Sequence, residues 1–305
     1  MAIYKTQPIF DKTIWGRSFL SKFKGNTESS IGTTWEISFH DYGSNFVESE
    51  NKTLSELISE NLSMLGSTPK EELLRIAYLD AKDNLSIQLH PTNEYASKYL
   101  SDKGKYEAWY IIEAKPGATI VVGTTTSDVE LIKEALLNNT FERYLHKVPV
   151  QADDFVYIPA GLVHALGKDI LAIEVSTSSN TTYRFYDYGR QNRELHLKES
   201  FDNLETSLYP IWSRVKESDG QKTVISRLCH NEFFVVDMID VVNNYTVFGK
   251  NQLLYLSIFS ENIEINGQLV QKYDSFLVDA HTESFVLTGN GKVLVSRSRD
   301  LDEIK

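Results

Sequence analysis

Hydrophobic and polar residues alternate over much of this chain, and this period of two predicts a mostly β protein. The clearest run alternates aliphatic and polar side chains in the order Leu85, Ser86, Ile87, Gln88, Leu89 and His90. Successive side chains of a strand point to opposite faces, so the three polar side chains share one face. Polar groups on an inner face need partners or a ligand, because burying them unpaired is costly.

Two regions depart from this alternation and predict helices inserted into the first part of the chain. In the first, at about 53–81, Thr53 and Glu56 have the spacing of a capping box. A second helix in the same region is predicted to begin near Pro69, since proline is favoured at the first helical position. In the second region, at about 127–146, apolar residues recur at helical spacing.

The C-terminal part reads as a series of short strands. The predicted strands are 233–239, 244–248, 253–259, 263–265, 274–278, 284–287 and 292–296. Hairpin turns are predicted at 266–267 and 289–291, because Asn-Gly and Gly-rich pairs favour such turns. The pattern predicts two domains, 1–205 and 206–305. Residues 154–161 also resemble residues 274–281, which indicates a duplicated β fold in which only the first copy keeps a metal.

Composition and charge narrow the class of protein. The 305 residues are 41% hydrophobic and 24% charged, which is typical of a globular chain. A net charge of −11 argues against a nucleic-acid or anionic-membrane surface. The single cysteine, Cys229, excludes an intramolecular disulfide and fits a reducing compartment. With no signal peptide and no apolar run of about 18 residues, a cytoplasmic protein is expected.

Four residues form a candidate metal site. Gln88 and His90 share one strand face, and Glu107 lies on a predicted strand that follows closely. His164 ends a Pro-x-Gly-x-x-His pattern, in which a tight turn returns the chain with the histidine inward. Two histidines and a carboxylate are a common zinc set, and they also suit non-haem iron. Either histidine taken singly is better interpreted as a satisfied structural residue.

The stretch 178–193 is rich in polar, aromatic and cationic residues. Arg184, Asp187, Arg190 and Arg193 cannot all be buried without partners. One interpretation is a solvated loop. The other is a lid or strand edge whose arginines meet a phosphate or a developing anion.

Taken together, these motifs resemble the cupins and, more narrowly, the short bacterial form of type I mannose-6-phosphate isomerases. The residues that carry the resemblance are 14–16, 35–38, 85–91, 104–110, 158–161, 164–166, 183–188 and Arg190. The resemblance implies a mostly β fold of two cupin-type jelly-roll domains, the first with inserted α-helices. It also implies a zinc enzyme that interconverts mannose 6-phosphate and fructose 6-phosphate, with one zinc ion per chain.

The resemblance further assigns roles to individual residues. It implies His90, Glu107 and His164 as metal ligands, Gln88 as a fourth ligand seen in some members, Arg184 as the active-site arginine, and Ser86, Lys105 and Arg190 as substrate or phosphate contacts. Moving a carbonyl between C1 and C2 of a sugar passes through an enediolate, whose charge a metal and Arg184 can stabilise. Lys105 shares a strand face with Glu107 and can assist there or bind phosphate. Glu174 is the first choice for the proton carrier, and a zinc-bound water is the second.

Three rival interpretations remain. The chain departs from the family at Tyr106, Ala108 and Leu166, so a catalytically silent sugar-phosphate-binding cupin is the main alternative. An iron-dependent cupin oxygenase is less favoured, because the arginines and Lys105 suit a phosphorylated substrate. A purely structural β protein leaves the polar strand face unexplained. The expected partner is a small sugar phosphate, with no nucleic acid and no membrane, and the sequence leaves the oligomeric state open.

Overall fold

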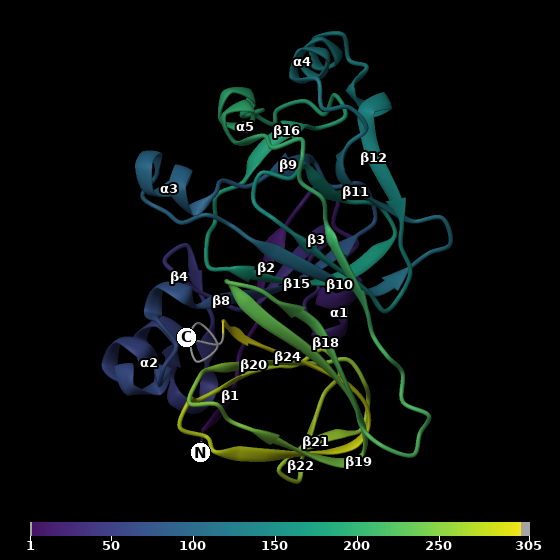
Figure 1. The fold of residues 1–305 in the computed structure, drawn as a ribbon. Helices are drawn as coiled ribbons and strands as arrows, with labels where there is room; N and C mark the ends of the chain where they lie inside the picture. Colours follow the sequence, from purple (N-terminus) through teal and green to yellow (C-terminus); the bar gives the residue numbers. More distant parts are fainter. Residues whose placement is uncertain (1, 300–305) are drawn as a thin grey trace. The chain divides into compact units, whose positions relative to one another are not determined.

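The computed structural model describes residues 2–299 and is mostly β, as predicted (Figure 1). The chain forms two compact units that do not follow sequence order. One, the central unit, comprises Phe10–Thr34 and Tyr78–Trp212. The other, the terminal unit, comprises Met1–Ile9, Trp35–Ala77 and Ser213–Lys305. The division at 205/206 stays a prediction.

Most residues of two sheets belong to the central unit. The seven-stranded sheet has the order β17-β13-β10-β15-β8-β3-β2, and the five-stranded sheet has the order β12-β11-β14-β9-β16. The first sheet consists of β17 (Ile211–Arg214), β13 (Asp154–Ile158), β10 (Glu107–Ala114), β15 (Ile170–Thr177), β8 (Leu74–Ala81), β3 (Ile31–Ile37) and β2 (Ile9–Lys12). The second consists of β12 (Leu145–Pro149), β11 (Thr119–Thr124), β14 (His164–Leu166), β9 (Ile87–Leu89) and β16 (Tyr183–Tyr186).

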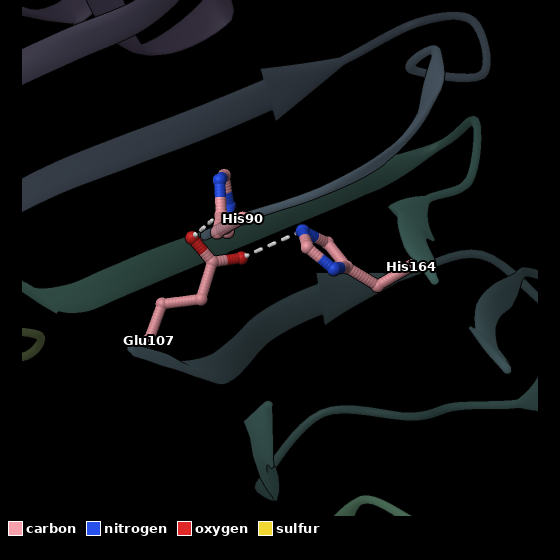
Figure 2. Close-up of side chains that lie close together, drawn as sticks. All are labelled: His90, Glu107 and His164. Atoms are coloured by element: carbon pink, nitrogen blue, oxygen red, sulfur yellow. Dashed lines mark hydrogen bonds and ion pairs between the residues drawn. The ribbon is translucent and has the colours of Figure 1, made fainter. Parts of the chain in front are cut away.

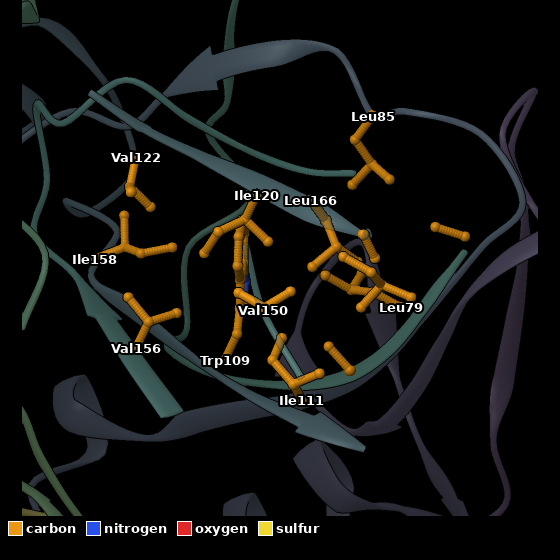
Figure 3. Packing of buried hydrophobic residues seen from close by; sticks show 14 of the residues in the cluster. Leu79, Leu85, Trp109, Ile111, Ile120, Val122, Val150, Val156, Ile158 and Leu166 are labelled. Carbon is orange, nitrogen blue, oxygen red and sulfur yellow. The ribbon is translucent and has the colours of Figure 1, made fainter. Parts of the chain in front are cut away.

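The inner faces of these sheets share one hydrophobic core (Figure 3). Trp109 and Ile111 enter it from β10, while Ile120 and Val122 enter it from β11 and Leu166 from β14. All of them are buried. Two sheets that enclose one core between their inner faces form a sandwich of the jelly-roll kind.

Helices cover the outer face of the five-stranded sheet. Ile87 and Leu89 of β9 pack outward in a cluster with α4 residues such as Ile132, so Gln88 between them faces the other way. The alternation within β9 is thereby explained, because Ile87 and Leu89 lie under the helices, whereas Leu85, which precedes the strand, packs in the inner core. The helices of this unit are α1 (Phe19–Phe23), α3 (Asn93–Tyr99), α4 (Val129–Leu137), α5 (Leu197–Asn203) and the 3-10 helix η4 (Phe141–Tyr144).

The helical region predicted at 53–81 is correct only in its first half. Thr53 caps α2 (Leu54–Glu60) in a capping box with Glu56, as predicted. The helix expected after Pro69 is wrong, because only one 3-10 turn forms there before the strand β8. Every residue of β8 is buried, since it is a central strand. A strand buried on both faces shows no alternation that would distinguish it from a helix.

The terminal unit is built on an eight-stranded sheet whose main path is β1-β23-β20-β24-β19-β18. Its strands are β1 (Ile3–Lys5), β23 (Ser275–Val278), β20 (Leu254–Ile258), β24 (Ser284–Ser298), β19 (Phe234–Phe248), β18 (Val224–His230), β21 (Ile263–Ile265) and β22 (Gln268–Val270). The same unit holds β4 (Phe39–His40), β5 (Gly43–Ser44), β6 (Phe46–Val47), β7 (Lys52–Thr53), α2 and the 3-10 helices η1 (Glu48–Glu50), η2 (Leu62–Leu65) and η3 (Lys70–Glu72).

The predicted hairpin turn at 289–291 is wrong. β24 continues through this stretch and pairs with β19 along its whole length. Gly289 serves close packing instead, because a Cβ there would lie 2.3 Å from the carbonyl oxygen of Asn262. The Asn266-Gly267 turn between β21 and β22 is confirmed, with both residues at positive φ.

Within residues 2–299, none of the helices combines the length and the apolar character needed to cross a membrane.

Candidate metal centre and active site

Three side chains meet inside the central unit at the ends of three strands. His90 directly follows β9, Glu107 begins β10 and His164 begins β14. Their ligand atoms all lie within 4.8 Å of one another (Figure 2). Each residue is about 1% exposed, so the group is enclosed by protein. The structure therefore brings together the three residues that the sequence predicts as ligands.

Strand register explains why they converge. His164 lies opposite Gln88 in the pairing of β14 with β9, so both project to the same face of the sheet. His90 lies two residues beyond Gln88 and shares that face. Glu107 projects from β10 of the other sheet, on the same face as Trp109 in the core. β13 and β14 belong to different sheets, so the Pro159–His164 turn links the two sheets and does not close a hairpin.

Backbone carbonyls fix the hydrogen on each imidazole ring. His90 Nδ1 lies 3.0 Å from the Thr181 carbonyl oxygen, and His164 Nδ1 lies 2.8 Å from the Leu162 carbonyl oxygen. A carbonyl oxygen only accepts, so Nδ1 carries the hydrogen in both rings. The Nε2 atom of each neutral ring then holds a lone pair, which is the form that binds a metal.

These lone pairs face a carboxylate, and this arrangement of donor atoms fits a cation-binding site. His90 Nε2 lies 3.1 Å from Glu107 Oε2, and His164 Nε2 lies 3.3 Å from Glu107 Oε1. Two acceptors in contact repel each other unless a proton or a metal lies between them. Glu107 Oε1 and His164 Nε2 are buried with no hydrogen-bond partner among the described residues. The donor set therefore fits a divalent metal with nitrogen and oxygen ligands.

Burial keeps the histidines neutral. It lowers the pKa of His164 from 6.5 to about 4, against the attraction of Glu107. Burial and then the charge of Lys105 lower the pKa of His90. Burial alone would raise the pKa of Glu107, but Lys105 and the two histidines hold it well below its ordinary value. At neutral pH the site therefore offers two uncharged imidazoles and one carboxylate.

A buried lysine joins this site to a second carboxylate. Lys105 Nζ lies 2.5 Å from Glu107 Oε2 and 3.0 Å from Glu174 Oε1. Ser176 donates its hydroxyl to the same Glu174 oxygen at 2.9 Å. The two carboxylates and Lys105 sum to a charge of −1, which a divalent cation would change to +1. An enclosed site of that charge suits an anionic intermediate.

The predicted substrate residues occupy different environments. Arg184 lies opposite Gln88 in the pairing of β16 with β9, on the face that carries His164. Its Nη1 donates to the Glu194 carbonyl oxygen at 2.7 Å, and its Nε is buried without an acceptor among residues 2–299. Ser86 is buried just before β9.

Arg190 is held by protein groups. It donates to the Asp187 carboxylate at 3.1 Å and to the Asn84 carbonyl oxygen at 2.8 Å, and it pairs with Asp83. Arg193 binds the other Asp187 oxygen at 2.7 Å. These contacts supply partners for the two partly buried arginines and hold the loop after β16 in place.

Known proteins with similar sequences share one name. The chain is 31% identical to mannose-6-phosphate isomerase ManA of Bacillus subtilis over 95% of its own length and 97% of the relative. It is 30% identical to the mannose-6-phosphate isomerase of Streptococcus mutans over 95% of its length and 96% of the relative. The chain belongs to the mannose-6-phosphate isomerase family. No family model matches the chain.

Solved structures agree with this family. The crystal structure of the B. subtilis mannose 6-phosphate isomerase matches 97% of the chain with a TM-score of 0.88 at 27% identity. A phosphomannose isomerase variant from Salmonella typhimurium matches 98% of the chain with a TM-score of 0.75 at 13% identity, which compares folds alone. The resemblance, the cupin-type fold class and the prediction of an enzyme of the mannose-6-phosphate isomerase family are confirmed.

Sequence reasoning missed several groups around the site of this family member. The carbonyls of Thr181 and Leu162 orient the histidines, and Ser176 holds Glu174. A backbone carbonyl has no signature in sequence, so the first two could not be found. Ser176 follows Glu174 by two residues and so shares its strand face. This spacing could have indicated the contact between them from the sequence.

Proposed function

We propose that this chain is a zinc-dependent aldose–ketose isomerase that interconverts mannose 6-phosphate and fructose 6-phosphate through an enediolate. Family membership supports the reaction. The observation that supports a metal site is the contact of the Glu107 carboxylate with the lone pairs of His90 and His164. Zinc suits two imidazoles and a carboxylate, and Gln88 stays a proposed fourth ligand.

Bound zinc would act as a Lewis acid that polarises the sugar carbonyl and stabilises negative charge on its oxygen. The protein's own groups hold and move the proton. We assign the proton transfer between C1 and C2 to Glu174, whose Oε1 is fixed by Lys105 and Ser176. A base held by two donors stays in one orientation, which favours proton transfer along a defined line.

Lys105 and Arg184 would stabilise charge. Lys105 lies between Glu107 and Glu174, so its ammonium can donate to an enediolate oxygen near either group. Arg184 has a buried Nε–H that finds no acceptor in the described part of the chain, on the same sheet face as the proposed ligands, and such a donor would suit an oxyanion. Ser86 and Arg190 remain the proposed phosphate contacts.

The direct test is turnover of mannose 6-phosphate in deuterium oxide. We expect fructose 6-phosphate to form, with deuterium from solvent in the sugar at the carbon that receives the proton. Tight sugar-phosphate binding with no turnover would identify the silent binder instead. An oxygen requirement together with bound iron would identify the oxygenase.

A further inference from the structure

The two histidine ligands are oriented in different ways. The carbonyl that fixes His164 belongs to Leu162, two residues away in the same tight turn. The carbonyl that fixes His90 belongs to Thr181, which is 91 residues away in sequence. Thr181 lies between β15 and β16 in a stretch without helix or strand. That stretch needs other contacts to hold its carbonyl in place.

Asp102 supplies these contacts. Its Oδ2 atom accepts hydrogen bonds from the Ser179 hydroxyl at 3.0 Å, the Asn180 backbone N–H at 3.1 Å and the Thr181 hydroxyl at 2.8 Å. One carboxylate oxygen therefore binds three consecutive residues, and the last of them carries the carbonyl that meets His90.

The other side of Asp102 is tied to the segment that leads into the site. Its Oδ1 accepts from the backbone N–H of Lys103 at 2.8 Å, two residues before Lys105. The hydroxyl of buried Ser179 also lies 2.8 Å from the Lys103 carbonyl oxygen. The carboxylate thus joins the segment that leads to Lys105 and Glu107 with the segment that orients His90.

We propose that Asp102 is a positioning residue of the metal centre, which holds the Thr181 carbonyl in place and thereby sets the tautomer and direction of the His90 ring. The inference rests on the proposed function, because it concerns how the site binds its metal. Asp102 itself does not touch the metal, the substrate or the reacting atoms.

A carboxylate is required for this contact. Donors approach both of its oxygens, so an amide in its place would direct its own N–H groups at other donors whichever way it turns. Burial alone would raise the pKa of Asp102, but the hydrogen bonds from Lys103, Thr181, Asn180 and Ser179 hold it below its ordinary value. The group is therefore ionised at neutral pH.

The test compares the zinc affinity of Asp102→Asn with that of a matched control, measured by competition with a chromogenic chelator. The control is Asp128→Asn, in which the changed carboxylate caps α4 by accepting from Glu130 and Leu131 in the same unit. We expect D102N to raise the Kd for zinc by about ten- to a hundredfold, as other outer contacts to metal-bound histidines do. D128N should leave it unchanged.

Two further measurements separate positioning from general loop stability. Thr181→Val keeps the carbonyl but removes the hydroxyl, so its zinc affinity should fall, whereas Thr181→Ser should retain it. The imidazole ¹⁵N spectrum of the metal-free protein should show the Nδ1–H tautomer of His90 in the wild type and mixed tautomers in D102N.

Equal zinc affinities for D102N and D128N would overturn the inference. A wild-type protein that binds no zinc would instead overturn the proposed metal. In that case the His90 spectrum still decides whether Asp102 sets the ring, and identical spectra in wild type and D102N would refute the positioning role.

Discussion

The central and terminal units contain two similar segments, residues 151–164 and 271–284, but only the first ends in a proposed metal ligand, His164. In the first, Gln151 N–H donates to Asp154 Oδ2 at 2.9 Å, and in the second Gln271 N–H donates to Asp274 Oδ2 at 3.1 Å. Leu162 N–H donates to the Pro159 carbonyl, and Thr282 N–H donates to the Asp279 carbonyl.

The difference lies in what stands at the end of each segment. The first reaches His164, which faces Glu107 and His90. At the corresponding place the second has Ser284. Within residues 2–299, the one group of three closely spaced metal-ligating side chains is His90, Glu107 and His164. The turn alone therefore makes no metal site, and the proposed metal also requires His90 and Glu107 from other parts of the central unit.

The largest effect is expected from His164→Ser, which gives the first segment the residue of the second. Loss of one ligand should abolish stoichiometric zinc binding and lower kcat/KM by at least about a thousandfold, which corresponds to about 4 kcal/mol. Metal analysis and a coupled assay for fructose 6-phosphate measure both. The reciprocal Ser284→His is the control and should gain no zinc, because the terminal unit offers no matching ligands among its described residues. Zinc binding by S284H would contradict the conclusion that the turn alone makes no metal site.

Glu174→Gln tests whether Glu174 of the central unit transfers the proton. The amide cannot take a proton, so kcat should fall by about 10²- to 10⁴-fold while zinc stays bound. Steady-state kinetics and metal analysis on the same preparation measure the two effects. Wild-type turnover would shift the proton transfer to another group, such as a zinc-bound water.

The proposed ligands could be predicted because alternation places Gln88 and His90 on one strand face and because the Pro-x-Gly-x-x-His turn marks His164. The supports around them could not, since Thr181 and Leu162 act through backbone carbonyls. The role of Asp102 could not be predicted either, because it depends on a contact with a loop far along the chain. The long strand β24 was split in the prediction because Gly289 favours a turn locally, whereas tertiary packing decides otherwise.

The two segments should also differ in how they affect the pH dependence of stability, because the first ends in the buried His164 and the second ends in Ser284. Unfolded His164 takes up a proton near pH 6.5, whereas the folded residue does so only near pH 4. Between these values the unfolded state binds more protons, so the metal-free protein should lose stability as the pH falls through this window. The contribution from His164 is about 3 kcal/mol. Urea unfolding at pH 7 and pH 4.5 should show a smaller loss for H164S, and an equal loss would contradict the assigned burial effect.

The smallest effect is expected where the segments are alike. Asp154→Ala and Asp274→Ala each remove a carboxylate that accepts from a turn N–H. Each should lower the free energy of unfolding by about 1 kcal/mol. Thermal and urea unfolding measure this loss. A much larger loss for D154A would mean that the first turn does more than act as a scaffold.

Removing the metal and restoring zinc tests most directly whether activity depends on zinc at the proposed site. Three preparations would be assayed for fructose 6-phosphate formed from mannose 6-phosphate. They are the protein as purified, the protein after exhaustive chelation, and the chelated protein after one equivalent of zinc is restored. The proposed site predicts that activity disappears with the metal and returns in proportion to zinc, up to one ion per chain. Undiminished activity in fully metal-free protein would contradict it.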